Sequence, residues 1–306
     1  MSLARSLTIL GVLVAGLTLL AVQATAGGSK HAASQVTCPS GSVRFGIEPY
    51  EDPAKLTPAY KVLAGALQKA LGCPVKLQIV EDYPAEVLAM RNKKLEIAEF
   101  GPLGFVFAYQ RAHAQPLVSF ADSKGHLTTY KAGIWVAADS PIRTIADLKG
   151  HSLALSEPGS TSGDALPRYA LKKAGLKQSD LKVTYAGGHP ESLLALVHGK
   201  VDAAEINSQT IASATEEGSF DEADYTQIWE SEPIANDPIT VSPDTSPEFQ
   251  KAVKEAMLSL DKEDVAAIGE YLDFTSGDQP LVEISESDYQ PVVDLADSLG
   301  LTPDDL

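Results

Sequence analysis

The chain is 306 residues long, and 44% of them are hydrophobic and 21% charged, which is typical of a globular protein and excludes the disordered and fibrous classes. A chain of this length is expected to form about two domains with a sizeable core. Lys and Arg number 24 against 41 Asp and Glu, and the resulting formal net charge of −17 argues against a nucleic-acid-binding surface. The one long apolar run lies at the start, so a bundle of membrane-spanning helices is excluded too.

Residues 1–26 have the pattern of a secretory signal peptide. Arg5 precedes an apolar run over residues 7–22, and the small residues Ala24 and Ala26 fit cleavage after Ala26. A membrane anchor or a buried helix is the alternative, but the run is short for a span and no stop-transfer charge follows it. No cysteine stands directly after the run, which argues against a lipid anchor. We therefore predict export to the periplasm.

Strand and helix patterns then alternate through the first half of the mature chain. Strands are predicted over residues 43–47, 75–80 and 97–100. Helices are predicted over 57–71, which ends at Gly72, over 84–90, and from 102 to 111. Such alternation predicts a parallel sheet covered by helices on both faces.

The two cysteines of the chain each precede one of these strands. Cys38 comes before the strand at 43–47, and Cys73 before the strand at 75–80. If the intervening helix returns the chain beside its starting point, the two strand starts are parallel neighbours and a disulfide is feasible. It would close a loop of about 35 residues and stabilise the fold by ~3–4 kcal/mol. Two free buried thiols are the alternative, but the oxidising periplasm favours a bridge, and we expect no metal role for either cysteine.

The alternation restarts in the second half of the chain. Residues 130–136 form a predicted strand, and a new series follows it. That series has strands at 152–155, 183–185 and 201–204 and helices at 161–174 and 190–197. Trp229 and residues 233–241 are interpreted as the returning strand, and the acidic segment from Ser246 onward as mainly helical.

These two series predict two α/β lobes, with the second inserted into the first. Lobe 1 is expected to comprise residues 27–135 and 241–306, and lobe 2 residues 136–240. The chain would cross between the lobes near 135–140 and again near 232–241. Ligand sites on such sheets lie beyond the carboxyl ends of the strands, in the cleft between lobes.

The segment Glu157-Pro158-Gly159-Ser160-Thr161-Ser162-Gly163 lies between a predicted strand and a predicted helix. Its hydroxyl groups can cap the helix, and the free N–H groups of the first turn carry partial positive charge that suits a small oxyanion. Gly159 and Gly163 permit close approach of the backbone. A plain helix cap, with no ligand, is the alternative for an isolated Ser-Thr-Ser.

This segment does not match the enzymatic motifs that it resembles. Thr161 stands where a nucleophile elbow requires Ser, and Asp164 stands where a phosphate-binding loop requires Lys. The six histidines have no metal-ligand spacing. We therefore predict a binding protein that is not an enzyme and that needs no metal and no cofactor.

Short segments spread over residues 43–241 form an ordered set. They are Phe45-Gly46-Ile47, Asp82-Tyr83, Met90-Arg91, Ile97-Ala98, Phe100-Gly101-Pro102, Tyr130, the segment 156–163, Ala186-Gly187-Gly188-His189, Val201-Asp202-Ala203 and Asn236-Asp237-Pro238-Ile239. Each is weak alone, but in this order they resemble the PhnD-type phosphonate, phosphite and phosphate substrate-binding proteins of ABC importers. The resemblance implies the two-lobed periplasmic binding protein fold of type II.

The resemblance also implies a set of oxyanion contacts from both lobes. They are Tyr83 and Tyr130 from one lobe, Ser160, Thr161, Ser162 and His189 from the other, and Asp237 beside the crossing. All but Asp237 can donate hydrogen bonds to anionic oxygens, whereas ionised Asp237 can only accept from a protonated ligand oxygen, which disfavours sulfate.

Each of these residues also has a purely structural interpretation. The tyrosines fit half-buried strand ends, and His189 and Asp237 fit turns beside glycine and proline.

Three further residues are candidates for the rim of the cleft: Glu205, Asn207 and Gln209. Relatives that bind aminoalkylphosphonates place an acidic residue where Gln209 stands, and an amide supplies no charge for an ammonium. The expected ligand is therefore a small phosphorus oxyanion without a cationic tail, namely phosphite, phosphate or methylphosphonate. The choice among these three is left open.

The expected function is that of the periplasmic, monomeric solute-binding component of an importer, whose partners are an ABC permease and ATPase complex in the inner membrane. An aminoalkylphosphonate binder and an oxyanion sensor for a signalling kinase are alternatives, and so is an enzyme of the same two-lobed shape. The sensors use a Cys for arsenic, whereas Cys38 and Cys73 lie away from the predicted cleft. The enzyme would need a His or Cys constellation that the chain lacks.

Overall fold

A computed structural model of the chain describes residues 36–303. The predicted signal peptide and its cleavage site lie outside this range. No helix among residues 36–303 combines the length and the apolar character that a membrane-spanning helix requires.

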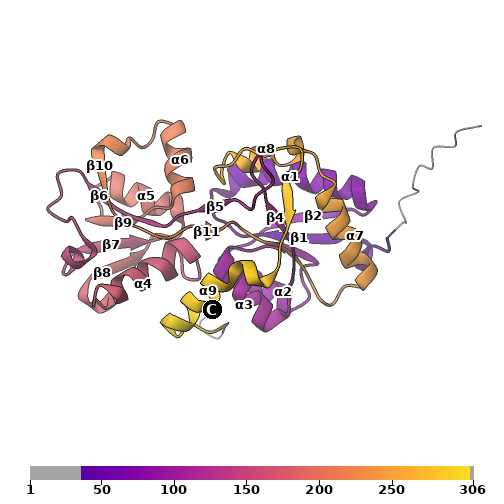
Figure 1. The fold of residues 1–306 in the computed structure, drawn as a ribbon, viewed down its shortest axis with the longest axis horizontal. Helices are drawn as coiled ribbons and strands as arrows, with labels where there is room; N and C mark the ends of the chain where they lie inside the picture. The colour runs from indigo at the N-terminus through magenta and orange to yellow at the C-terminus, as the bar shows by residue number, and fades with distance from the viewer. Residues whose placement is uncertain (1–35, 304–306) are drawn as a thin grey trace, which may run out of the picture. The chain divides into compact units, whose positions relative to one another are not determined.

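A six-stranded sheet and the helices on its two faces form the first lobe (Figure 1). Its strands, in spatial order, are β13 (Leu281–Glu283), β4 (Gln115–Phe120), β12 (Ile239–Val241), β3 (Ile97–Glu99), β1 (Val43–Ile47) and β2 (Val75–Ile79). Strand β1 is parallel to β2 and β3, whereas β12 is antiparallel to β3 and β4. One face packs against α1 (Pro53–Leu71), α7 (Pro247–Leu258) and α8 (Ala266–Gly269), and the other against α2 (Tyr83–Arg91), α3 (Pro102–Ala112) and α9 (Gln290–Leu299).

Helix α1 illustrates how the sequence builds this lobe. Tyr60, Leu63 and Leu67 recur at helical spacing and are fully buried in the core. The helix begins at Pro53, four residues before the predicted start, because the side chain of Asp52 caps it by accepting from the N–H of Ala54.

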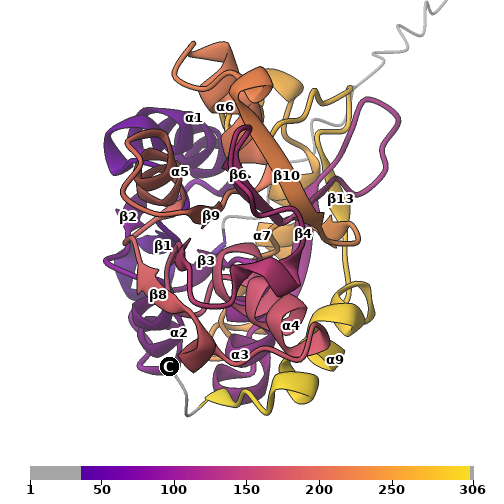
Figure 2. The same ribbon diagram turned by 90° about the vertical axis from the view of Figure 1, so that its left-hand side faces the viewer.

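A five-stranded sheet forms the second lobe, which faces the viewer in Figure 2. Its strands, in spatial order, are β10 (Tyr225–Glu230), β6 (Gly133–Ala137), β9 (Ala203–Glu205), β7 (Ser152–Leu155) and β8 (Lys182–Tyr185). Helix α4 (Leu166–Lys173) packs on one face, and α5 (His189–Val197) and α6 (Ser208–Glu216) pack on the other.

The chain passes between the lobes through a short two-stranded sheet of β5 (Thr129–Tyr130) and β11 (Ile234–Ala235), which lies between the two larger sheets in Figure 1. The predicted two-lobed α/β fold is therefore confirmed. The predicted lobe limits at 135/136 and 240/241 fall inside β6 and β12. All of β6, from residue 133, belongs to the sheet of the second lobe, and all of β12, from residue 239, belongs to the sheet of the first.

The predicted elements differ from the structure in several details. The strand expected over 130–136 is split into β5 and β6 by two residues, because the chain leaves the crossing sheet to join the second lobe. Strand β13 interrupts the C-terminal segment that was expected to be mainly helical, since it pairs with β4 at the edge of the first sheet. Strand β4 and helix α6 have no counterpart among the predicted elements, and the returning strand predicted over 233–241 is divided into β11 and β12.

The predicted disulfide between Cys38 and Cys73 is present, with 5.6 Å between the Cα atoms. The register of the sheet brings the two residues together, because β1 and β2 are parallel neighbours that pair Val43 with Val75. Cys73 is fully buried against the core of the first lobe, so the bridge ties the start of the described chain to that core.

Replacing both cysteines by alanine is expected to lower the free energy of unfolding by about 3–4 kcal/mol, because the unfolded chain loses a closed loop. Urea unfolding with and without a reductant measures this. The reductant should destabilise the wild-type protein to the level of the Cys38→Ala/Cys73→Ala variant and leave the variant unchanged. Equal stability of the oxidised wild type and the variant would contradict the prediction.

Candidate functional site

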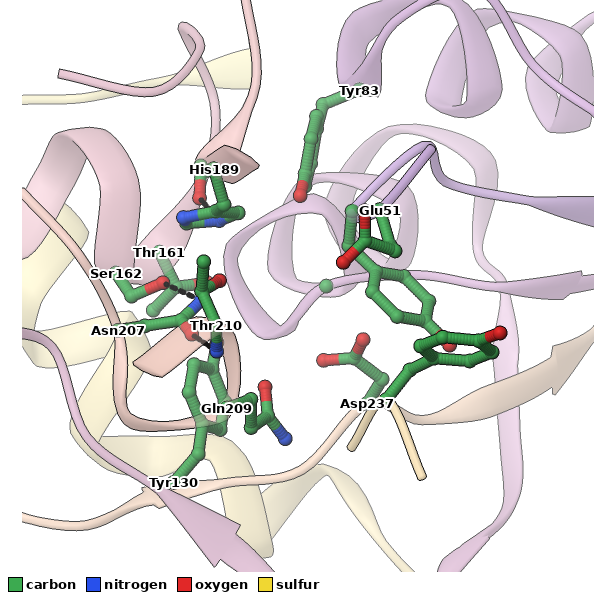
Figure 3. Close-up of a pocket in the computed structure, with 14 residues that line it drawn as sticks. Glu51, Tyr83, Tyr130, Thr161, Ser162, His189, Asn207, Gln209, Thr210 and Asp237 are labelled. Atoms are coloured by element: carbon green, nitrogen blue, oxygen red, sulfur yellow. Dashed lines mark hydrogen bonds between the residues drawn. The ribbon is translucent and has the colours of Figure 1, made fainter. Parts of the chain in front are cut away.

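A small cavity lies between the two lobes at the crossing segments (Figure 3). The volume open to the centre of a water molecule is about 20 Å³, so there is room only for a ligand of a few heavy atoms. The lining residues are Tyr50, Glu51, Tyr83, Gly101 and Tyr271 from the first lobe, Ser160, Thr161, Ser162, His189, Asn207, Gln209 and Thr210 from the second, and Tyr130 and Asp237 from the crossing segments.

Within residues 36–303, five helical segments begin at this cavity. Helix α2 starts at Tyr83, and α5 at His189. Gly101 precedes α3, Ser160 precedes the turn that leads into α4, and Asn207 precedes α6. Because the first N–H groups of a helix have no partner within it, each of these ends contributes partial positive charge. The cavity is therefore suited to an anion.

Residues 160–162 after β7, which we call the hydroxyl segment, contribute three hydroxyl side chains to the wall. Thr161 begins a π-helical turn, Thr161–Ala165, which continues directly into α4, so the predicted helix start at 161 holds with a wider first turn. The side chain of Ser160 accepts a hydrogen bond of 3.0 Å from the N–H of Gly163. A Cβ atom at Gly163 would lie 1.6 Å from the hydroxyl oxygen of Ser156, so any side chain there would force Ser156 to move.

The hydroxyl of Thr161 also connects the two lobes. Its Oγ1 accepts a hydrogen bond of 2.8 Å from the N–H of Leu103 in the first turn of α3. Both residues are buried, so this bond is shielded from water. The bond exists only while the second lobe is seated against the first.

His189 is held from behind by a buried carboxylate. Its Nδ1 lies 3.2 Å from Oε2 of Glu205, and its Nε2 lies 3.2 Å from Oγ of Ser160 at the cavity. Burial disfavours the charged ring and is the largest single effect, but the charge and hydrogen bond of Glu205, together with the charges of Asp237 and Glu157, outweigh it, so the pKa of His189 is raised. Glu205, expected at the rim, is fully buried behind the histidine because β9 directs it inward.

Asp237 faces the cavity from the crossing segment, opposite the hydroxyl segment (Figure 3). Burial raises its pKa to about 7, although the nearby charge of His189 opposes the shift. Near neutral pH the carboxyl group is therefore poised between its ionised and its protonated form.

Three buried glutamates lie in the first lobe behind the cavity wall: Glu48, Glu86 and Glu99, each at most 1% exposed. Glu48 accepts a hydrogen bond of 2.6 Å from the N–H of Gly101, and Glu99 accepts one from the hydroxyl of Tyr60. Both oxygens of Glu86 and one each of the other two have no partner in the described chain. Burial, followed by repulsion from neighbouring carboxylates, raises each pKa well above its usual value. The protein environment therefore favours the protonated, neutral form of all three groups.

All seven residues expected to contact a ligand line one cavity, and so do Asn207 and Gln209. Sequence reasoning missed Tyr50, Glu51, Gly101, Thr210 and Tyr271. Strand ends could have indicated Tyr50, Glu51 and Gly101, which closely follow β1 and β3, whereas no pattern marks Tyr271. No cluster of three or more His, Cys, Asp or Glu side chains suited to a metal occurs in the described part of the chain.

Residues 45–289 match the profile of a family described as "ABC transporter, phosphonate, periplasmic substrate-binding protein". The "Phosphonates-binding periplasmic protein" of Escherichia coli is 30% identical over 203 residues, which are 65% of this chain and 60% of the relative. The "Phosphate-import protein PhnD" of Mycolicibacterium smegmatis is 26% identical over 217 residues, 67% of this chain and 68% of the relative. The chain thus matches three fifths to two thirds of these relatives' length.

Among solved structures, PhnD1 from Prochlorococcus marinus in complex with methylphosphonate has a similar fold. The TM-score is 0.75, with 19% identity, and the match covers 86% of this chain and 99% of the other. At this identity the likeness establishes the two-lobed architecture of type II binding proteins and nothing about the ligand.

The buried glutamates predict a specific dependence of stability on pH. A carboxyl group whose pKa is raised by folding keeps a proton that the unfolded chain has lost. Its contribution to the free energy of unfolding therefore falls as the pH rises above its pKa in the unfolded chain, which is about 4.3. The isosteric change Glu86→Gln removes the titrating group and with it this pH-dependent contribution to stability. Between pH 5 and 8 the free energy of unfolding of the variant should fall less steeply, by up to about 1.4 kcal/mol per pH unit.

Urea unfolding at several pH values measures the two slopes. Glu255→Gln is the matched control, since that side chain is exposed on α7 and should leave the slope of the wild type unchanged. Parallel pH profiles for wild type and Glu86→Gln would mean that Glu86 is ionised in the fold.

Proposed function

Because the chain belongs to the family of periplasmic substrate-binding proteins of phosphonate ABC transporters, as its sequence predicted, we propose that it binds a small phosphorus oxyanion between its lobes and delivers it to an importer. The ligand is phosphate, phosphite or methylphosphonate. The partners of the protein are a permease and an ATPase in the inner membrane. The protein acts as a monomer and catalyses no reaction.

The convergence of helix starts on one small cavity carries this proposal. The N-terminal ends around Ser160, His189 and Asn207 supply donors and partial positive charge from the second lobe, and the helix starts at Tyr83 and Gly101 add partial positive charge from the first. A protein with a net charge of −17 attracts an anion only through such local donors.

The two lobes then act as the two halves of a trap. A hinge motion about the crossing segments would bring Tyr83 against the hydroxyl segment and exclude water from the anion. His189 donates from Nε2, with Glu205 holding its ring in place. Asp237 accepts from a protonated ligand oxygen, so a sulfate ion, which carries no hydrogen, leaves that carboxylate unpaired.

One alternative ligand class has an observation in its favour. The wall opposite the hydroxyl segment contains Glu51, Asp237 and the rings of Tyr50 and Tyr271, and acidic and aromatic groups of this kind accommodate an ammonium. An aminoalkylphosphonate would suit such a wall. The small volume of the cavity favours an oxyanion without the additional chain.

Substitutions at the two sides of the cavity should weaken binding without unfolding the protein. Ser162→Ala removes a donor, and Asp237→Ala removes the acceptor for the ligand O–H. Each is expected to cost roughly 1–3 kcal/mol of binding free energy. Calorimetric titration with phosphate, phosphite and methylphosphonate measures the loss.

Ser287→Ala and Asp297→Ala are the matched controls, since both residues are exposed on the first lobe. They should bind as the wild type does. Unchanged affinity in both Ser162→Ala and Asp237→Ala would rule out this cavity as the site.

A ligand panel tests the selectivity that follows from Asp237. Phosphate, phosphite or methylphosphonate should bind at least tenfold more tightly than sulfate at about pH 8.5, above the pKa of Asp237 of about 7, because sulfate lacks a hydrogen for the ionised carboxylate. Aminoethylphosphonate is included in the same calorimetric series, and tightest binding of this compound would favour the alternative class. Sulfate binding as tightly as phosphate would contradict the role of Asp237.

A further inference from the structure

Gln209 occupies a position at which the cavity, the second lobe and the crossing segment meet. It is the second residue of α6, is only 7% exposed, and lines the cavity. Figure 3 shows its amide oxygen on the cavity side, toward Asp237, and its amide nitrogen on the far side.

Both N–H groups of the Gln209 amide are used within the protein. Nε2 donates to the main-chain oxygen of Leu272 in the first lobe at 3.0 Å, and to Oδ1 of Asn236 in the crossing segment at 3.3 Å. A main-chain oxygen can only accept, so the nitrogen must face Leu272.

The orientation of Asn236 is fixed in the same way. Its Oδ1 accepts from the N–H of Asp237 at 3.0 Å, and its Nδ2 donates to Oγ1 of Thr128 at 3.1 Å. Thr128 in turn donates its hydroxyl hydrogen to the main-chain oxygen of Phe120. Main-chain groups anchor this chain of bonds, so neither amide can rotate by half a turn without losing hydrogen bonds. Oε1 of Gln209 is left for the cavity.

We propose that Gln209 is a specificity-determining residue of the anion site, where its fixed acceptor oxygen, together with Asp237, selects an oxyanion that carries two P–OH groups, which is dihydrogen phosphate. This inference rests on the function proposed above. An acceptor that meets a P–H, a P–CH3 or an unprotonated oxygen is buried without a hydrogen bond, which is unfavourable. A second P–OH group satisfies it.

Phosphorus monoanions offer a graded series for the test with the wild-type protein. Dihydrogen phosphate has two O–H groups, the phosphite and methylphosphonate monoanions have one, and hypophosphite has none. Calorimetric affinities, expressed per concentration of monoanion, should follow this order, with dihydrogen phosphate about tenfold tighter than phosphite and methylphosphonate. Tighter or equal binding of either one-donor ligand overturns the proposal.

The variant Gln209→Met keeps the length of the side chain and removes its acceptor. The preference for phosphate over methylphosphonate should fall by about tenfold, because phosphate loses a partner and the methyl group gains an apolar neighbour. Gln290→Met, at an exposed position on α9, should keep the wild-type preference. Equal weakening of both ligands in Gln209→Met would mean that Gln209 only holds the lobes together, and would overturn the proposal.

The outcomes separate this inference from the function on which it rests. If the four monoanions bind but their order is unrelated to the number of O–H groups, the proposed function stands and the role of Gln209 is refuted. If the wild-type protein binds none of them, both proposals are refuted.

Discussion

The convergence of helix N-termini on a single cavity is the constraint on which the rest of this structure depends. An acidic protein has few ways to create a site for an anion, and no Lys or Arg side chain is among the buried residues of the described chain. Main-chain N–H groups at helix starts carry no formal charge and need no counterion, yet they present partial positive charge in a fixed direction. In the part of the chain that the structure describes, five helical segments begin at the cavity because each follows a strand whose carboxyl end lies at this edge of its sheet.

The buried carboxyl groups around the cavity agree with this electrostatic arrangement. Ionised side chains at Glu48, Glu86 and Glu99 would oppose the partial positive charge of the helix ends, but burial raises their pKa and favours the neutral form, which does not oppose it. Glu205 serves differently, because its contact with His189 favours the charged ring. The same residue type therefore has opposite effects in the two lobes, according to whether a basic partner is within reach.

Contacts between the lobes involve the residues of the cavity themselves. Thr161 accepts from Leu103 across the interface, and Gln209 donates to Leu272 from the opposite side of the cavity. On the exposed surface, Lys55 and Glu217 form an ion pair of 2.6 Å between the lobes. Closure and the shape of the cavity are thus linked, since the side chains that line the cavity also hold the lobes in register.

Local patterns in the sequence determined the two α/β lobes, the disulfide and the family. Each of these depends on residues that are close together in the sequence. Examples are the helical spacing of Tyr60, Leu63 and Leu67, the cysteines before two strands, and the hydroxyl segment before α4. The family resemblance, rather than any local pattern, indicated seven residues that the structure brings together at one cavity.

Tertiary structure alone decided the raised pKa of the three buried glutamates, the location of Glu205 behind His189, and the direction of the Gln209 amide. Tyr271 likewise reaches the cavity only because α8 packs on the first sheet, and β13 becomes a strand only because β4 offers it an edge. Burial and hydrogen-bond partners that are distant in sequence set these properties, and a pattern of neighbouring residues contains no information about either.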